Sequence, residues 1–182
     1  MEFRIKLRPF KREDAVFVNK LRQHENSEKT IGGNKRPVSY ERDVKWIEDI
    51  MLSDNQKVIY FALSYIENDD IIGYVSISDI DYRNGSCFWS GTKIDPTISS
   101  KGLGTESSVL LLRYIFEEMR MERCKGEALE DNLGALRMLE KLGFKKEGLQ
   151  RHSVYKNGQY NNQWILSMLK EEFQVLKKDF NL

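Results

Sequence analysis

The sequence predicts an α+β (α/β) fold in a single domain covering residues 1–182, with a mixed sheet and helices packed on its faces. Short runs that alternate apolar and polar residues, as strands do, are interspersed with longer runs at helical spacing. Three of the strand runs follow one another with only tight turns between them, which favours antiparallel pairing. The length of 182 residues also suits one hydrophobic core.

The N-terminal part of the chain predicts one strand and two helices. Residues 3–8, FRIKLR, alternate apolar and basic side chains and are typical of a half-buried strand. Residues 13–24 have helical spacing, and the polar run 24–36 predicts a loop. Ser39 is a suitable N-cap for a second helix over ERDVKWIEDIML.

The rest of the chain alternates strands with helices, and turn signals such as Asn68-Asp69-Asp70 and Arg83-Asn84-Gly85 separate the strands. The resulting order, β-α-α-β-β-β-α-β-α-β-β, gives a mostly antiparallel seven-stranded twisted sheet flanked by four helices. The expected elements are strands 58–66, 71–80 and 86–94, helix 104–120, strand 122–129, helix 132–142, and two strands after Phe144 that join at Lys156-Asn157-Gly158.

Composition excludes several classes of protein. Lys and Arg number 29 against 28 Asp and Glu, and this balance argues against nucleic-acid binding. Cys87 and Cys124 lack CxxC spacing, so we expect buried thiols and neither a disulfide nor a metal site. The charged N-terminus does not resemble a signal peptide, and no run is long and apolar enough to cross a membrane. A cytoplasmic protein is expected.

The segment Ser99–Glu106, SSKGLGTE, precedes the strongest predicted helix. Two glycines permit a tight turn, and the start of a helix offers unpaired N–H groups, which together make an anion site. A glycine loop without a ligand is the alternative. A Walker loop would need Gly-Lys-Ser/Thr, but Thr105 follows Gly104; a dinucleotide fingerprint would need Gly or Ala at Ser107.

Three stretches, IDPTISSKGLGTES, EALEDNLGALRMLEKLGFKKEG and YKNGQYNNQWILSMLKEEF, resemble the GNAT N-acetyltransferase superfamily, and within it the RimJ/RimL-type branch. With the element order, the resemblance covers essentially the whole chain, although the first fifty residues match by layout only. It implies a GNAT domain that uses acetyl-CoA and no metal. Ser99 departs from the Gln or Arg of the family's loop. The residues expected to contact the coenzyme are Ile94, Lys101, Gly102, Leu103, Gly104, Thr105, Asn132 and Ala135.

The same resemblance implies that a primary amine attacks the thioester directly. Only about one alkyl amine in a thousand is deprotonated at pH 7, so a general base is valuable. Relatives often place a Glu where this chain has Trp89. Glu127 is the expected base, or else a solvated strand charge; Glu130 is a second candidate, and Asp79 and Asp81 are weaker ones.

A leaving thiolate can take its proton from a side chain or from water. Many relatives use a Tyr where this chain has Leu139. Tyr155 is the expected replacement, with Tyr160 beside it, unless both only pack across the hairpin. A main-chain N–H near residues 90–92 is expected to meet the oxyanion, because Gly91 permits a close approach.

The stretch VYKNGQYNN also resembles polyamine and nucleotide-amino-sugar acetyltransferases of the same branch. This resemblance implies a small-molecule amine as the acceptor, tested first as a nucleotide-linked amino sugar and then as the polyamine spermidine. Trp46, Trp89 and Glu28 are the expected substrate contacts, although Trp46 on an amphipathic helix suits the core equally. The acidic residues Glu25, Glu28, Glu41 and Glu48 suit a cationic acceptor.

Other functions stay open. One alternative is an N-acetyltransferase whose acceptor is a protein N-terminus, as in ribosomal-protein acetyltransferases. The absence of the usual base and acid at Trp89 and Leu139 would also suit a non-catalytic acyl-CoA binding module, and an interaction scaffold without a cofactor is a third possibility. Antiparallel edge strands would permit a homodimer.

Overall fold

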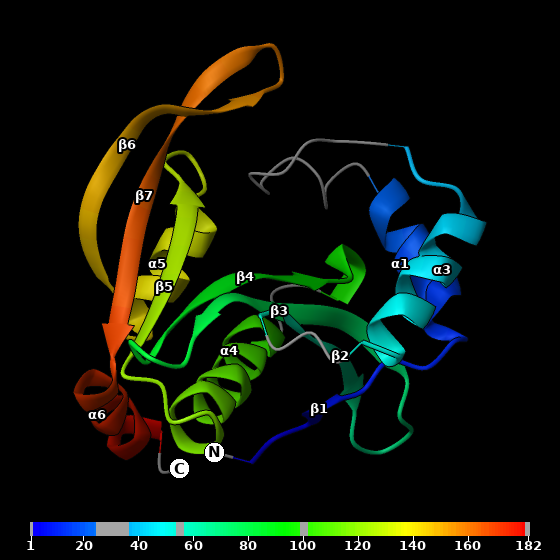
Figure 1. The fold of residues 1–182 in the computed structure, drawn as a ribbon, viewed down its shortest axis with the longest axis horizontal. Coiled ribbons are helices and arrows are strands. Elements are labelled where there is room, and N and C mark those ends of the chain that lie inside the picture. The colour runs from blue at the N-terminus through cyan, green and yellow to red at the C-terminus, as the bar shows by residue number, and fades with distance from the viewer. Residues whose placement is uncertain (1, 25–36, 54–56, 99–101, 181–182) are drawn as a thin grey trace.

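A computed structural model describes residues 2–24, 37–53, 57–98 and 102–180. Seven strands form one twisted sheet in the order β1-β2-β3-β4-β5-β7-β6 (Figure 1). All neighbouring strands are antiparallel except β4 and β5, which confirms the predicted mixed sheet. The strands are β1 (Ile5–Arg8), β2 (Ile59–Tyr65), β3 (Ile71–Asp81), β4 (Ser86–Ile94), β5 (Arg123–Leu129), β6 (Lys145–Lys156) and β7 (Gln159–Leu169).

Five α-helices lie in the described part of the chain, one more than the sequence analysis expected. The additional helix is α6, which follows β7 without a Gly or Pro between them. No described helix has both the length and the apolar composition that a membrane span requires. The helices are α1 (Asp14–Gln23), α3 (Tyr40–Met51), α4 (Leu103–Arg113), α5 (Leu133–Lys141) and α6 (Lys170–Phe180), with a π-helical turn (Tyr114–Glu118) after α4 and a 3-10 turn (Pro96–Ile98) after β4.

The ends of several helices follow from local sequence. The hydroxyl oxygen of Ser39 accepts the main-chain N–H of Arg42 at 3.3 Å, which confirms the predicted N-cap of α3. Gly143 has φ +95° directly after the last turn of α5, and this left-handed conformation ends the helix. At the start of α6, the carboxylate of Glu172 accepts the main-chain N–H of Leu169 at 2.8 Å.

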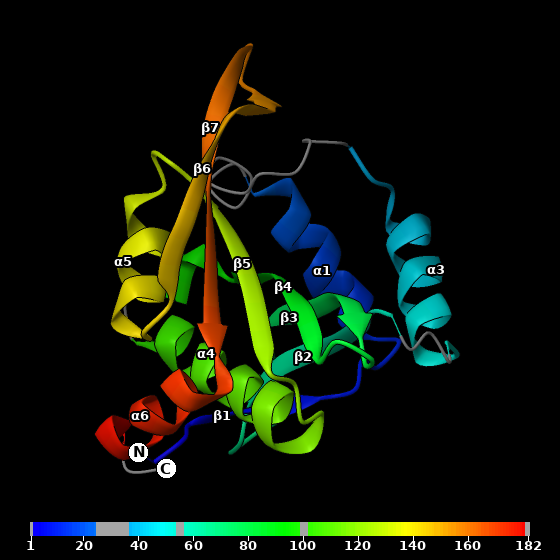
Figure 2. The ribbon, with the colours of Figure 1, turned by 60° about the vertical axis from the view of Figure 1, so that its left-hand side comes forward.

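Helices cover both faces of the sheet, with α4 and α5 on one face and α1 and α3 on the other (Figure 2). Alternate strand residues therefore enter different cores. Leu63 and Val75 pack in the core that includes residues of α4, α5 and α6. Ala62 and Tyr74, their chain neighbours, pack in the second core beneath α1 and α3. Both Cys87 and Cys124 are fully buried, as expected.

The parallel pairing of β4 and β5 is short. Its recorded partners run only from Ser86 opposite Arg123 to Phe88 opposite Lys125. Beyond these residues β5 continues to pair with β7 as far as Leu129 opposite Gln163. The two strands therefore separate towards their C-terminal ends, and this separation creates the space in which the candidate site lies.

Candidate active site

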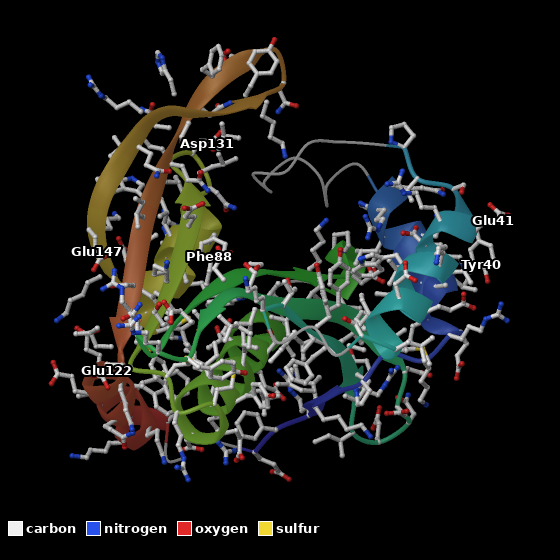
Figure 3. The ribbon with its side chains drawn as sticks, viewed as in Figure 1. Tyr40, Glu41, Phe88, Glu122, Asp131 and Glu147 are labelled. Carbon is white, nitrogen blue, oxygen red and sulfur yellow. The ribbon has the colours of Figure 1, made fainter. Side chains whose placement is uncertain are left out.

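A cavity of about 390 Å³ lies where β4 and β5 separate, within the size range of small-molecule sites. Phe88, at the last position of β4 that pairs with β5, lies beside β5 in Figure 3. The cavity is lined by residues 88–92 of β4, residues 126–129 of β5, Asn132, Ala135, Met138 and Leu139 at α5, and Val154 and Gln163 of the β6–β7 hairpin.

The facing edges of β4 and β5 at this cavity do not pair with each other in the described part of the chain. On β5, residues 126–129 pair with β7 on one edge, but no pairing with β4 is recorded for them in the described structure. On β4, Trp89, Gly91 and Thr92 pair with β3, and none of these described residues pairs with β5. Buried peptide groups need hydrogen-bonding partners, so an extended ligand with amide groups is suited to this cleft.

A β-bulge shapes the β4 wall. Gly91 pairs with Ser76 and Trp89 pairs with Ile77, so Ser90 is an extra residue in β4. Gly91 has φ +114°, a conformation that disfavours any residue with a Cβ. The bulge bends β4 at the level of the cavity.

The N-terminus of α4 lies next to the cavity. Gly102 has φ +81° and accepts the first intrahelical bond, from the N–H of Glu106 at 3.1 Å. Among the residues that the structure describes, no side chain caps the start of α4, so this end can bind an anion. A Cβ built on Gly104 would lie 3.7 Å from Sδ of Met138, a cavity-lining residue. The anion site and the cleft are therefore contiguous.

The expected coenzyme contacts lie in three places. Gly102, Leu103, Gly104 and Thr105 form the start of α4, while Lys101 lies outside the described residues. Asn132 and Ala135 line the cavity, where the Asn132 side-chain oxygen accepts the N–H of Ala135 at 3.1 Å and caps α5. Ile94, at the end of β4, packs against the core and does not line the cavity.

Glu127 lies on the cavity wall, on the face of β5 opposite its buried neighbour Ala128. Its carboxylate accepts a hydrogen bond from Nε2 of Gln163 at 2.9 Å. Partial burial raises the pKa of Glu127 above its ordinary 4.5, Lys125 opposes this effect, and the negative charge of Asp79 adds to it. Sequence reasoning did not identify Gln163, whose position depends on the register of β7 against β5.

The other acid and base candidates lie outside the cavity. Glu130 accepts a hydrogen bond from Nδ2 of Asn162 at 2.8 Å, and it lines a separate polar pocket of about 270 Å³ with its neighbour Asp131 (Figure 3). Tyr155 is exposed on the hairpin and contacts Tyr160 edge to face at 5.0 Å. Leu139 is buried and lines the cavity.

The expected substrate contacts are dispersed. Trp89 lines the cavity but is only 5% exposed, and its ring packs against Phe144 on the face covered by α4 and α5. Trp46 packs in the second core with Tyr60, and the Arg22 guanidinium lies 4.9 Å from its ring centre. Glu28 lies outside the described residues. Acceptor contacts by Trp46 and Glu28 stay predictions.

Comparison with known proteins defines the class. Residues 4–145 match the model of the acetyltransferase (GNAT) domain. The fold and this match define an N-acetyltransferase with acetyl-CoA as its acyl donor. The chain belongs to the GNAT acetyltransferase family.

Several characterised and uncharacterised relatives are similar over much of the chain. The probable N-acetyltransferase YjcK of Bacillus subtilis is 32% identical over 62% of each chain. Spermidine N(1)-acetyltransferase of Escherichia coli is 24% identical over 93% of this chain and 88% of its own length. The crystal structure of spermidine N-acetyltransferase from Vibrio cholerae, in complex with CoA and spermine, has a TM-score of 0.84 at 20% identity and covers 94% of this chain and 98% of that one.

The chemistry of the site fits acetyl-CoA as a substrate. The N–H groups at the start of α4 suit the diphosphate. The facing edges of β4 and β5, which do not pair with each other beyond Phe88, suit the amide groups of the pantetheine arm. Among the described residues, no group of three or more His, Cys, Asp or Glu side chains could hold a metal ion.

Proposed function

We propose that this protein transfers the acetyl group of acetyl-CoA to a small-molecule primary amine, with a polyamine as the first acceptor to test. The observation that carries the proposal is the cleft between β4 and β5, which is contiguous with the anion-binding start of α4. The coenzyme can extend from the helix into the cleft. Its thioester then lies near Gly91 and Glu127.

The reaction proceeds by direct attack. The amine nitrogen forms a bond to the carbonyl carbon, and the electron pair of the C=O bond moves to the carbonyl oxygen. A main-chain N–H at Gly91 stabilises the resulting oxyanion. The proton lost from nitrogen passes to Glu127, directly or through water. The electron pair on the oxyanion then re-forms the C=O bond of the amide as the C–S bond breaks, and the thiolate leaves with the electron pair of that bond.

Charge on the acceptor side supports a cationic substrate. Glu127 is on the cavity wall, and Asp79 lies close enough for its charge to raise the pKa of Glu127. A second ammonium group on the acceptor would be attracted to this pair of carboxylates. Relatives named as spermidine acetyltransferases add support for an acceptor of this kind.

A protein N-terminus is the competing acceptor, because a putative ribosomal N-acetyltransferase, YdaF of Bacillus subtilis, is 27% identical over 57% of this chain. That similarity and the sequence motifs also support the RimJ/RimL-type branch. The position of β6 at the edge of the sheet supports a homodimer, in keeping with the sequence prediction.

The test is a panel of amines with detection of the released thiol. Spermidine, a nucleotide-linked amino sugar and a peptide with a free N-terminus are each supplied with acetyl-CoA. We expect turnover with spermidine to exceed turnover with the peptide. Preference for the peptide would contradict the small-molecule assignment. Binding of acetyl-CoA without thiol release for any amine would favour the non-catalytic module.

A further inference from the structure

Two hydrogen bonds cross the bulge of β4, one on each side of Gly91. On the face covered by α4 and α5, the indole N–H of Trp89 donates to Oγ1 of Thr92 at 3.2 Å. On the opposite face, the hydroxyl of Ser90 donates to Oγ of Ser78 at 2.7 Å. Gly91, with φ +114°, lies between them. Both bonds restrict the main chain at this bulge of β4.

The Trp89–Thr92 bond depends on the bulge. In a regular strand, residues three apart point to opposite faces, so these two side chains could not meet. Because Ser90 is an extra residue, Thr92 lies on the same face of the sheet as Trp89. Trp89 pairs with Ile77 and Thr92 pairs with Val75. Ile77 and Val75 belong to the same core. The hydrogen bond therefore forms only in the bulged conformation and stabilises that conformation selectively.

Burial makes this bond costly to break. Trp89 is 5% exposed, and its ring centre lies 5.9 Å from that of Phe144. An indole N–H on a ring that is 5% exposed replaces a lost acceptor poorly with water, so the loss carries a desolvation penalty. The packing of the ring thus supports a fixed position for Thr92 and for the main chain of Gly91 between them.

We propose that Trp89 is a positioning residue that acts through Thr92 to hold the N–H of Gly91 towards the thioester. This inference rests on the proposed function, because the thioester is assigned to the cleft there. It gives Trp89 a role other than substrate contact. The Trp89–Thr92 hydrogen bond is needed because a Cβ at Gly91 would meet nothing within 4 Å, so packing around Gly91 does not fix its conformation.

The test uses variants that each remove one hydrogen-bonding group; Thr92→Val keeps the side-chain volume, whereas Trp89→Phe also makes the ring smaller. Trp89→Phe removes the N–H donor, Thr92→Val removes the acceptor, and Thr92→Ser is the matched control that keeps a hydroxyl. We expect kcat to fall about tenfold in the first two variants, with the KM for acetyl-CoA within about twofold of the original. The double variant should lose no more than Trp89→Phe alone, because that substitution already removes the hydrogen bond that Thr92→Val removes.

A second readout does not depend on turnover. Hydrogen exchange of the segment 88–93 should accelerate in Thr92→Val and not in Thr92→Ser. If Trp89→Phe fails to fold, Thr92→Val alone decides the question. Unchanged kcat and exchange in Thr92→Val, or additive losses in the double variant, would overturn the proposal.

The two assignments fail in different ways. If the protein acetylates no amine but hydrogen exchange accelerates in Thr92→Val, the proposed function is refuted and the role of the Trp89–Thr92 bond in fixing the main chain is retained. If the protein acetylates amines and Thr92→Val leaves both kcat and hydrogen exchange unchanged, only the positioning role of Trp89 is refuted.

Discussion

The carboxylate of Glu106 accepts the main-chain N–H of Ile5 at 3.0 Å and so ties the first turn of α4 to β1. The same carboxylate accepts the N–H of Arg4 and pairs with its guanidinium at 2.9 Å. Glu106 places a negative charge one turn from the expected diphosphate, and these donors neutralise it. The anion-binding end of α4 is thereby anchored to the sheet without loss of its positive character.

Glu106→Ala is expected to lower the free energy of unfolding by about 3 kcal/mol, because buried donors lose a charged acceptor. Chemical denaturation measures the change. Arg4→Ala is the control, and its effect should be smaller because the Arg4 side chain is 54% exposed. Equal losses in the two variants would contradict the assignment of Glu106 as the anchor.

Glu127→Gln is expected to lower kcat about a hundredfold, because the substituted amide cannot accept the proton from the amine. In the unsubstituted enzyme, activity should rise with pH through an apparent pKa above 4.5, and this acidic limb should vanish in Glu127→Gln. Gln163→Ala, which removes only a hydrogen-bond donor to Glu127, is the milder control. An unchanged rate and profile in Glu127→Gln would remove this base.

Asp79→Asn is expected to move the acidic limb to lower pH. The negative charge of Asp79 raises the pKa of Glu127, so its removal favours the ionised carboxylate. The pH dependence of kcat/KM measures the shift, and Asp81→Asn provides a comparison on the same strand. A shift to higher pH would show that the sign of this interaction is wrong.

Gly102→Ala is expected to raise the KM for acetyl-CoA about tenfold, because a Cβ at φ +81° distorts the start of α4 where the diphosphate binds. Gly158→Ala is a matched control, since Gly158 has φ +80° at the hairpin turn, away from the cleft. Both variants should lose about 1–2 kcal/mol of stability through backbone strain. A similar KM in the two variants would argue against the helix start as the coenzyme site.

The ion pair of Glu117 with Lys177 links the π-helical turn to α6 and should make stability dependent on pH. The hydrogen bond from Lys177 is the main cause that holds the pKa of Glu117 below its ordinary 4.5. The contribution is therefore present above about pH 4.5 and is lost as pH falls through the lowered value.

Glu117→Gln should lose about 1 kcal/mol at neutral pH, and the difference should shrink below about pH 4.5. The exposed neighbour Glu118 provides the control as Glu118→Gln, which should change little. Thermal unfolding across this range measures both variants. If the stability lost in Glu117→Gln grows as the pH falls, the predicted direction of the pH dependence is wrong.

Local sequence signals predicted most of the fold. Ser39 marked the start of α3, and Gly143 marked the end of α5, because caps depend on neighbouring residues alone. The helix α6 was not predicted, since β7 runs into it without a breaking residue. The spacing of Phe173, Leu176 and Phe180 was the available signal.

Only those parts of the site that depend on residues close together in the sequence were predictable. The loop before α4 could be read from its glycines, and Asn132 from its place before a helix. The partnership of Gln163 with Glu127 depends on how β7 pairs with β5, and the meeting of Trp89 with Thr92 depends on a bulge. Such long-range register is set by the assembled sheet, so the sequence pattern does not specify it.

The central claim is that acetyl-CoA binds with its diphosphate at the start of α4 and its pantetheine arm between β4 and β5. A crystal structure with coenzyme A at saturating concentration tests it most directly. The account predicts diphosphate oxygens within hydrogen-bonding distance of the N–H groups of residues 103–105. Coenzyme A bound elsewhere on the molecule, with this cleft closed by the protein's own side chains, would contradict it.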